Sequence, residues 1–343
     1  MSKPLLVIKF GTSSITDAQG VPDEAVIERI AHEMSTLHTN HNLVLVSSGA
    51  VGAGKSFIKN YDGRLSKRKA AAAIGNPLLI GKFQYYFEKK GIRLAQSLCE
   101  RRHFSKRELF LQLKDTYQEL WDNEIIPVAN ENDVISDREL KFSDNDELAT
   151  LIAVGFGAKL LMIATESGGL LDKERQIVPK VKEINEEVMG LVDTKKSSLG
   201  LGGMSSKLTF AKLATRMGIG VTIFGIKTHQ GGILKAFDGE SGTTFDASEV
   251  NLSSRNKWLA SGGLTTAKIK IDDGAVEALK DRKSLLAVGI MRISGRFDKG
   301  EVVEIVDAKN QVIAVARTRK ASEELSSEKQ KMVVAHADDI AIF

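Results

Sequence analysis

The stretch at residues 43–56, LVLVSSGAVGAGKS, contains a glycine pattern that can bind phosphate. From Gly49 to Ser56 it reads G-x-x-x-x-G-K-S, in which backbone N–H groups cradle a phosphate and the lysine, here Lys55, approaches it. The pattern predicts a nucleotide site, although it also arises by chance in turns rich in glycine and alanine. Such a site needs a magnesium-binding aspartate after a second strand. The nearest candidate, KLLMIATES at 159–167, ends in Thr-Glu instead.

Two other lysines occupy positions that a bound anion would explain. Lys9 lies inside the apolar run LLVIKF, where a buried charge is costly unless it meets an anion. Gly11 and small hydroxyl residues follow at once and let backbone N–H groups approach a phosphate. Lys207 ends the segment GLGGMSSK, in a first helical turn where the helix dipole disfavours a cation. A phosphate would account for both lysines; the alternatives are an edge-strand lysine and a surface lysine.

A third stretch, NENDVISDRELKFSDNDELA at 130–149, interleaves asparagines with carboxylates at the end of a predicted strand. Asn and Asp are common in solvated loops for turn reasons alone. Together they could also bind a small ligand that carries both an amine and a carboxylate. An EF-hand is excluded because the glycine at its sixth position is missing. Ser143 and Asp144 fit as caps of the helix that follows, but capping does not explain the whole set: Asn130, Glu131, Asn132, Asp133, Asp137, Asp144, Asn145 and Asp146.

The elements that must position these residues alternate along the chain. Short apolar runs predict buried strands at 5–10, 43–48, 125–130, 159–165 and 220–225. Helical patterns lie between them at 23–38, 66–90, 105–123, 145–157 and 204–217. Such alternation predicts a largely parallel sheet with helices on both faces. Ligands then bind at the carboxyl ends of the strands, where the polar motifs cluster.

The pattern of apolar and polar residues changes from about residue 264. AKIKIDDGA, EVVEIVDA and QVIAVARTR are short alternating segments that predict antiparallel strands. NLSSRNKWLASGG at 251–263 has the composition of a linker, so we place a domain boundary near residue 260.

Composition narrows the class of protein. The 343 residues allow about two domains, and the net charge of +4 makes no strong case for nucleic acid. The single cysteine, Cys99, excludes an internal disulfide and is expected to be a buried, inert thiol. No apolar run approaches the ~20 residues of a membrane span, and there is no H-E-x-x-H or C-x-x-C motif. We therefore expect a cytoplasmic protein without a metal site of its own.

Together the motifs resemble the amino-acid kinase family. The matching segments occur in the family's order and spacing: VIKFGTS, SSGAVGAG, PVANENDV, KFSDNDELA, ATESGGL and GLGGMSSK. The tail resembles a PUA domain, with SSRNKWLASG at the joint followed by GAVEAL, KSLLAVGI, SGRFDKGEVVEI and HADDI. The resemblance implies an α/β kinase sandwich with a largely parallel central sheet flanked by helices at 1–258, and a small mostly-β PUA-like domain at 264–343.

NEND combined with a PUA-like tail points to those family members that phosphorylate the side-chain carboxylate of glutamate with ATP, in proline biosynthesis. By resemblance, Lys9 and Lys207 contact the phosphates and Asp146 orients both lysines. The implied glutamate site is Ser48, Gly49, Ala50, Asn130, Asp133 and Asn145. The implied ATP site is Lys9, Gly11, Thr165, Glu166, Leu201, Gly202, Gly203, Met204, Ser205, Ser206 and Lys207. Asp133, Lys141 and Asn145 resemble the part that senses proline, the feedback inhibitor.

The resemblance also implies a cofactor and partners: Mg²⁺ carried mainly by ATP, a homo-oligomer, and a glutamyl-phosphate reductase that consumes the labile product. The chain departs from the family pattern where Leu201 replaces a threonine, in a shortened loop after 168 and in an abbreviated tail. The chemistry agrees with the family, because a carboxylate acceptor, with a pKa of about 4.3, needs cations and alignment but no general base.

Two alternatives stay open besides the phosphate-binding loop. The first is a related kinase with another acceptor, such as aspartate or acetylglutamate. The second is an RNA-binding protein, since PUA domains elsewhere bind RNA. Residues 264–343 hold 14 Lys and Arg against 13 Asp and Glu, a net charge of +1 that lacks a basic patch. RLSKRK at 64–69 and RRHFSKR at 101–107 are more basic and favour solvated helix faces, although the first could border the substrate pocket.

Overall fold

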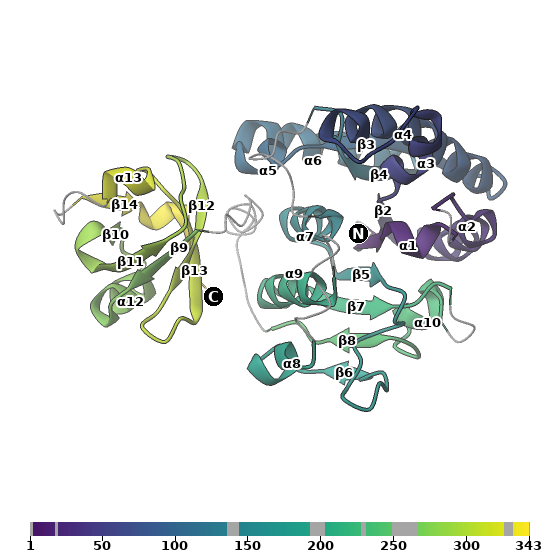
Figure 1. Ribbon diagram of the computed structural model, residues 1–343. Coiled ribbons are helices and arrows are strands. Elements are labelled where there is room, and N and C mark those ends of the chain that lie inside the picture. Colours follow the sequence, from purple (N-terminus) through teal and green to yellow (C-terminus); the bar gives the residue numbers. More distant parts are fainter. Residues whose placement is uncertain are drawn as a thin grey trace.

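The computed structural model describes residues 3–17, 20–135, 144–192, 203–227, 231–248, 267–325 and 332–342. Figure 1 shows an α/β unit formed by the N-terminal part of the chain and a smaller, mostly β unit formed by the C-terminal part. The predicted linker and domain boundary at 251–263 lie outside the described residues.

Within the described residues, the first unit is built on an eight-stranded sheet in the order β3-β4-β2-β1-β5-β7-β8-β6. Neighbouring strands run parallel, except that β8 is antiparallel to β7. The strands span Leu5–Phe10 (β1), Asn42–Ser47 (β2), Arg93–Cys99 (β3), Ile125–Glu131 (β4), Leu160–Ala164 (β5), Lys180–Val181 (β6), Gly220–Phe224 (β7) and Thr243–Phe245 (β8).

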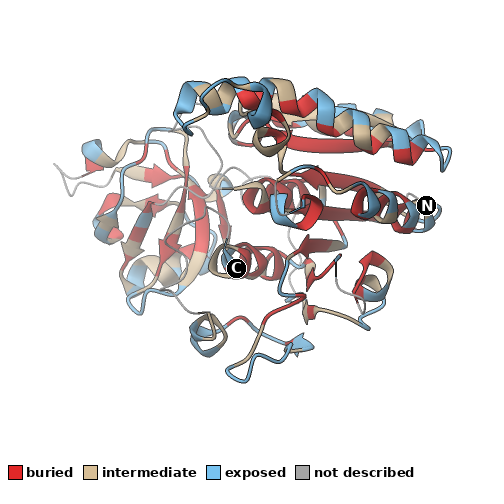
Figure 2. Ribbon diagram, turned by 45° about the vertical axis from the view of Figure 1, so that its right-hand side comes forward, coloured by how far each residue is buried: buried red, intermediate tan, exposed pale blue. Residues whose placement is uncertain are grey.

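Helices cover both faces of this sheet, as the view along its layers in Figure 1 shows. They are α1 (Thr12–Ile15), α2 (Glu24–His38), α3 (Ala50–Gly54), η1 (Lys55–Phe57), α4 (Leu65–Glu88), α5 (Arg102–Ser105), α6 (Arg107–Asp122), α7 (Asn145–Phe156), α8 (Glu186–Gly190), α9 (Met204–Arg216) and α10 (Ile233–Phe237). The predicted three-layer α/β fold is thus confirmed, and Figure 2 shows its central strands fully buried.

The two-residue period of β1 decides which side chain meets which layer. Leu6, Ile8 and Phe10 join a core with α2, α4 and α10. Leu5 and Val7 join the opposite core, with α6, α7 and α9. Lys9 continues the second series, so its side chain must point toward the layer that holds α7 and α9.

All five predicted strands and all five predicted helices are present, with ends displaced by no more than two residues. The sequence reading missed β3, β6 and β8 and the short helices. β3 is an edge strand with a partly exposed burial pattern, which weakens its apolar signal. β6 and β8 have only two and three residues, too few to show a period.

The C-terminal unit confirms the predicted small β domain. The strand at Val302–Val306 is antiparallel to Val312–Arg317, as predicted, but it is parallel to Lys268–Ile271, where the prediction of antiparallel pairing was wrong. Its five-stranded sheet has the order β11-β9-β12-β13-β15, and β10 pairs separately with β14. A core of alternate strand residues, including Ile269, Val303 and Ala316, lies on one face of the sheet. The elements are β9 (Lys268–Ile271), α12 (Asp273–Lys280), β10 (Leu285–Leu286), η3 (Ala287–Gly289), β11 (Ile290–Ser294), β12 (Val302–Val306), β13 (Val312–Arg317), α13 (Ser322–Leu325), β14 (Val333–Ala335), η4 (Ala337–Asp339) and β15 (Ile340–Ile342).

Cys99 ends β3 and is fully buried, as predicted. Burial raises the pKa of its thiol to about 11. The group is therefore protonated at neutral pH, and a protonated thiol is a poor nucleophile.

Candidate active site

Two lysines and one aspartate form a buried cluster at the carboxyl end of β1. The Lys9 Nζ lies 2.6 Å from Asp146 Oδ1, and the Lys207 Nζ lies 2.9 Å from Asp146 Oδ2. Lys9 comes from β1, Asp146 from the first turn of α7, and Lys207 from the first turn of α9. All three are buried, and Asp146 has no exposed surface. The structure thus brings together the three residues predicted to act on the phosphates.

The electrostatics of this cluster favour an anion as its ligand. Burial would raise the pKa of the Asp146 carboxyl group, but the ammonium groups of Lys9 and Lys207 hold it below its ordinary value. The three groups together then carry a net charge of +1. A buried positive charge is costly unless an anion approaches it. Gly11 leaves room for such an approach, since a Cβ there would lie 3.4 Å from the Lys9 Nζ.

Asp144 links the helices that carry Asp146 and Lys207. Its Oδ1 accepts hydrogen bonds from the backbone N–H groups of Asp146 and Glu147, at 3.0 and 3.1 Å, and so caps α7. Its Oδ2 accepts a 2.6 Å hydrogen bond from Ser206 Oγ, in the first turn of α9. One predicted capping residue therefore fixes the distance between two helix N-termini. Ser143, the other predicted cap, lies outside the described residues.

A network of asparagine side chains lies beside the cluster. The Asn145 Nδ2 is 2.9 Å from both Ser48 Oγ and Asn130 Oδ1, and 3.1 Å from the Ser47 carbonyl oxygen. Asn130 Nδ2 donates in turn to Asn76 Oδ1 at 3.0 Å. The Asn145 Oδ1 is buried and has no hydrogen-bond partner among the described residues. It is therefore free to accept a hydrogen bond from a ligand.

A cavity of about 370 Å³ opens over the lysine cluster. It lies at the carboxyl ends of β1 and β5, two adjacent strands whose chain connections leave in opposite directions, toward β2 and β7. Seven residues of the predicted ATP site line it: Lys9, Gly11, Thr165, Glu166, Gly203, Met204 and Lys207. The other lining residues were not predicted for the ATP site: Thr12, Ser13, Ser14, Ser48, Asp144, Asn145 and Ala164. Ser205 and Ser206 are not among the lining residues, and Leu201 and Gly202 lie outside the described residues. We call this hollow the donor cavity.

A second cavity, of about 330 Å³, adjoins the first. The two share Thr12, Ser48, Asp144 and Asn145 as a common wall. All six residues of the predicted glutamate site line it: Ser48, Gly49, Ala50, Asn130, Asp133 and Asn145. The other lining residues were not predicted for the glutamate site: Thr12, Val51, Gly52, Arg68, Glu131 and Asp144. Arg68 belongs to the basic stretch 64–69, for which a solvated helix face was favoured and a place beside the pocket was the alternative. We call this hollow the acceptor cavity; Lys141 of the predicted proline-sensing set lies outside the described residues.

Comparisons with known proteins identify the family. Residues 4–225 match the amino acid kinase family, and residues 267–338 match the PUA domain. The chain is 36% identical over 338 residues to the glutamate 5-kinase of Bacillus cereus strain G9842, covering 95% of this chain and 92% of the relative. It is 33% identical over 346 residues to that of Vibrio vulnificus strain YJ016, covering 98% and 90%.

The chain belongs to the glutamate 5-kinases of the amino acid kinase family. A solved structure supports the fold of the kinase unit: carbamate kinase from Giardia lamblia bound to AMP-PNP. Its TM-score is 0.52 at 18% sequence identity, and the match covers 71% of this chain and 99% of that one. Among the described residues, no helix is long and apolar enough to cross a membrane.

In this glutamate 5-kinase family member, the P-loop-like glycines serve helix packing. Gly49 adopts φ 108° at the start of α3, a left-handed conformation that favours glycine. A Cβ at Gly54 would lie 1.9 Å from the Ala71 carbonyl oxygen, and one at Gly75 would lie 1.7 Å from the Ala50 carbonyl oxygen. α3 and α4 therefore touch through their backbones. Lys55 does not line the donor cavity.

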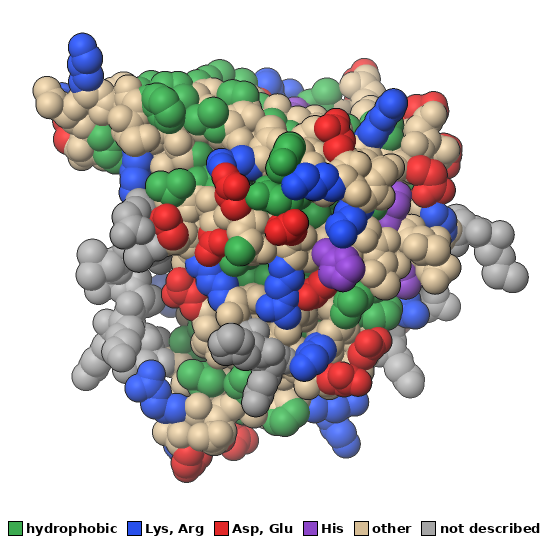
Figure 3. Space-filling model, turned by 90° about the vertical axis from the view of Figure 1, so that its right-hand side faces the viewer, with side chains coloured by type: hydrophobic (Ala, Val, Ile, Leu, Met, Phe, Trp, Pro, Cys, Tyr) green, Lys and Arg blue, Asp and Glu red, His purple; other side chains and the backbone are tan. Residues whose placement is uncertain are grey.

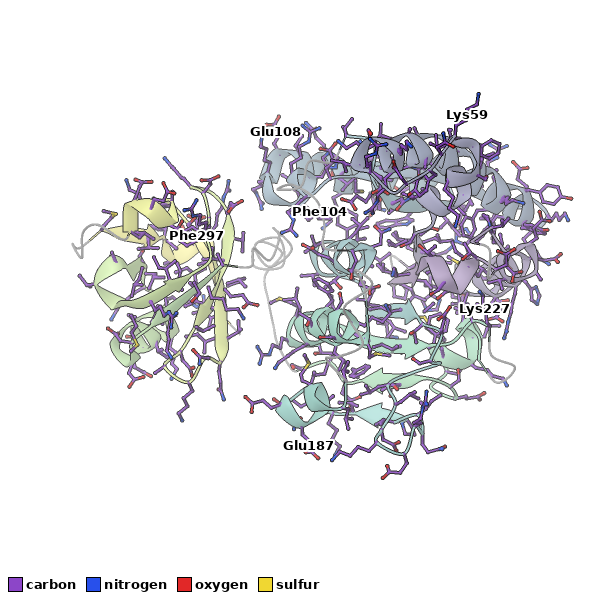
Figure 4. All side chains as sticks on the ribbon, in the orientation of Figure 1. Lys59, Phe104, Glu108, Glu187, Lys227 and Phe297 are labelled. Carbon is purple, nitrogen blue, oxygen red and sulfur yellow. The ribbon has the colours of Figure 1, made fainter. Side chains whose placement is uncertain are left out.

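Lys55 instead lines a neighbouring hollow together with Lys227, which the sequence reading did not single out. Figure 4 shows the Lys227 side chain between α1 and α10. Its Nζ donates to the Ser13 carbonyl oxygen at 2.7 Å and also to that of Thr16. These bonds fix the turn that follows β1, and with it one wall of the donor cavity.

The PUA domain gathers three cations on one sheet face despite its balanced charge. Lys268, Lys270 and Arg292 line a hollow on β9 and β11. Lys268 forms an ion pair with Glu304 at 2.8 Å, and Lys270 donates to Asn310 at 3.1 Å. These partners reduce the charge that a nucleic-acid backbone would meet. The cavities of the kinase unit, rather than this sheet face of the PUA domain, are therefore the basis for the proposed function.

Proposed function

We propose that the protein transfers the γ-phosphoryl group of ATP to the side-chain carboxylate of L-glutamate. The product would be L-glutamyl 5-phosphate, and the reaction would be the first step of proline biosynthesis. One observation carries the proposal: the donor and acceptor cavities meet at Ser48 and Asn145, beside the cluster of Lys9, Asp146 and Lys207. An acceptor on one side of this wall would face a phosphate on the other.

The reaction needs cations and alignment more than proton transfer. A glutamate side chain is already ionised at neutral pH, because its pKa is about 4.3. One carboxylate oxygen bonds to the γ-phosphorus while the bond from phosphorus to the β–γ bridging oxygen breaks, and ADP leaves. Both reactants are anions, so Lys9 and Lys207 would neutralise charge on the transferring group. Asp146, paired with both ammonium groups, would keep them aimed at it.

Recognition of the amino acid would fall to the asparagine network and the acidic residues of the acceptor cavity. The free Asn145 Oδ1 could accept a hydrogen bond from the α-ammonium group of the substrate. Asp133 lines the same cavity and offers a carboxylate to the same group. The backbone of Ser48, Gly49 and Ala50, where β2 ends and α3 begins, would contact the side-chain carboxylate at the shared wall.

Mg²⁺ would arrive with ATP and remain bound mainly by its phosphates. Among the described residues, no group of three His, Cys, Asp or Glu side chains could hold a metal ion alone. Asp144 and Glu166 are the carboxylates that line the donor cavity. This donor set suits Mg²⁺, which keeps several waters and binds through substrate phosphates and one or two carboxylates. The bound ion would offset phosphate charge as the acceptor carboxylate approaches.

An acceptor screen tests the assignment. We expect ATP consumption to depend on L-glutamate, and to stay near background with aspartate, acetylglutamate or UMP. Aspartate is shorter by one methylene group, so its carboxylate would not reach the donor cavity. ADP release with each acceptor at equal concentration is the measurement. Turnover with aspartate or acetylglutamate that exceeds turnover with glutamate would reassign the acceptor within the family.

We further propose that L-proline inhibits by occupying the acceptor cavity. Proline carries an amine and a carboxylate but no side-chain carboxylate, so it could use Asp133 and Asn145 without reacting. We expect proline to raise the KM for glutamate and to leave kcat unchanged at saturating glutamate. Initial rates over a grid of both amino acids measure this. Inhibition that saturating glutamate does not relieve would place the proline site elsewhere.

Two kinds of protein partner belong to the proposal. Exposed hydrophobic side chains occur along and beside α4, at Phe57, Leu65, Leu78 and Tyr85. Figure 3 shows hydrophobic side chains on the surface toward the top of the molecule. They support a homo-oligomer, which sedimentation analysis tests; a monomer at micromolar concentration would contradict it.

The labile acyl phosphate supports a glutamyl-phosphate reductase as the consumer. Faster reductase turnover with the kinase present than with chemically supplied acyl phosphate would measure a direct hand-over, and equal rates would exclude it.

A further inference from the structure

The acceptor cavity is rich in acidic side chains, which raises the question of how it tolerates a dicarboxylic acid. Glu131, Asp133 and Asp144 contribute three carboxyl groups to its lining. Among the described residues that line it, Arg68 is the single cation. Glutamate brings two carboxylates, and one must face the donor cavity to react. The α-carboxylate would remain among like charges unless a cation meets it.

Arg68 is positioned and available for that contact. It is the fourth residue of α4, and its side chain is exposed at the cavity. Two neighbouring cations are already engaged, since Arg64 and Lys67 both contact the Asp62 carboxylate, at 2.6 and 3.2 Å. Among the described residues, the Arg68 guanidinium group makes no hydrogen bond or ion pair. A cation in the first turn of a helix is also disfavoured by the helix dipole.

The glycine contact between α3 and α4 explains why this turn reaches the cavity. Gly54 and Gly75 allow the two helices to meet backbone to backbone. α3 carries Ala50, which lines the acceptor cavity. The first turn of α4 is therefore held beside the loop where the substrate would lie.

We propose that Arg68 determines acceptor specificity by binding the α-carboxylate of the amino acid. A guanidinium group presents parallel N–H donors that match both oxygens of a carboxylate. The α-ammonium group would then lie toward Asp133 and Asn145, and the side-chain carboxylate would extend to the wall shared with the donor cavity. This inference rests on the proposed function, because it assumes that the acceptor is an amino acid.

The test compares glutamate with 4-aminobutyrate, which keeps the amine and the reacting carboxylate but lacks the α-carboxylate. In Arg68→Ala, we expect the KM for glutamate to rise about 10- to 100-fold with kcat and the KM for ATP nearly unchanged. The inhibition constant of 4-aminobutyrate against glutamate should be unchanged, because that molecule does not use Arg68. Arg68→Lys should fall between Arg68→Ala and the unchanged protein. Arg64→Ala, at the start of the same helix but outside the cavity, is the matched control and should keep normal kinetics.

The outcomes separate this inference from the function it rests on. If the unchanged protein turns over glutamate and Arg68→Ala has a normal KM, the role of Arg68 is excluded while the function stands. The same holds if the variant weakens glutamate and 4-aminobutyrate equally, since the loss would then be structural. If the unchanged protein does not use glutamate, both the proposed function and this inference fail.

Discussion

Replacing Lys207 or Lys9 with alanine is expected to lower kcat about 10²- to 10³-fold, the usual cost of losing one electrostatic stabiliser of a transition state. Each lysine is paired with Asp146, so removing one leaves that carboxylate still paired with the other. The fold should therefore persist, and circular dichroism with urea unfolding would verify it. Steady-state kinetics with ATP and glutamate measure the loss. The effect should lie in kcat, because both ammonium groups would act mainly on charge that develops during transfer.

Lys55→Ala is the matched control for this experiment. Lys55 belongs to the P-loop-like pattern but lies outside the donor cavity, so its removal should leave kcat and the KM for ATP nearly unchanged. The opposite pattern would overturn the account. Loss of ATP binding in Lys55→Ala, with normal kcat in Lys9→Ala and Lys207→Ala, would return the phosphate site to residues 49–56.

Gly75→Ala should produce the largest loss of stability among the single changes considered. The added Cβ would lie 1.7 Å from the Ala50 carbonyl oxygen and 2.8 Å from the Gly54 backbone nitrogen. Both are backbone atoms, so α3 and α4 would have to separate. We expect the free energy of unfolding to fall by about 3 kcal/mol or more, at the upper end of overpacking effects. Urea unfolding followed by circular dichroism provides the measurement.

The same helix contains a second glycine, Gly81, at which the same substitution serves as a control. A Cβ at Gly81 would meet no atom within 4 Å, so Gly81→Ala should be neutral or should stabilise the protein by up to about 1 kcal/mol through helix propensity. Equal effects of the two substitutions would show that the close contact between α3 and α4 does not exist in solution. The position of Arg68 beside the acceptor cavity would then lose its structural basis.

Much of the site could be predicted because its residues follow strand ends. Lys9 stands in a short apolar run that predicts a buried strand, and the alternation of side chains along any strand places it on the same face as Leu5 and Val7. Asn130, Asp133 and Asn145 lie after or beside another strand end, where a parallel sheet collects its ligand residues. Local pattern therefore carries information about which polar groups converge. Their roles in binding remain predictions that the kinetic experiments test.

What could not be predicted depends on contacts between distant segments. Asn76 lies in the middle of α4, and only the fold shows that its Oδ1 accepts from Asn130. Arg68 looked like part of a solvated basic face until α3 and α4 were seen to touch. The G-x-x-x-x-G-K-S pattern was misleading for the same reason, since Gly54 is needed by a helix that begins eleven residues later, at Leu65. Spacing along the chain does not reveal which glycine meets which backbone.

Trapping the product is the most direct test of the central claim. Hydroxylamine converts an acyl phosphate into a stable hydroxamate, so the enzyme would be incubated with ATP, Mg²⁺, L-glutamate and hydroxylamine. We expect γ-glutamyl hydroxamate in an amount equal to the ADP formed, and almost none with Lys207→Ala or with aspartate as acceptor. ADP formation without hydroxamate, or a hydroxamate formed from aspartate and not from glutamate, would contradict phosphoryl transfer to the glutamate side chain.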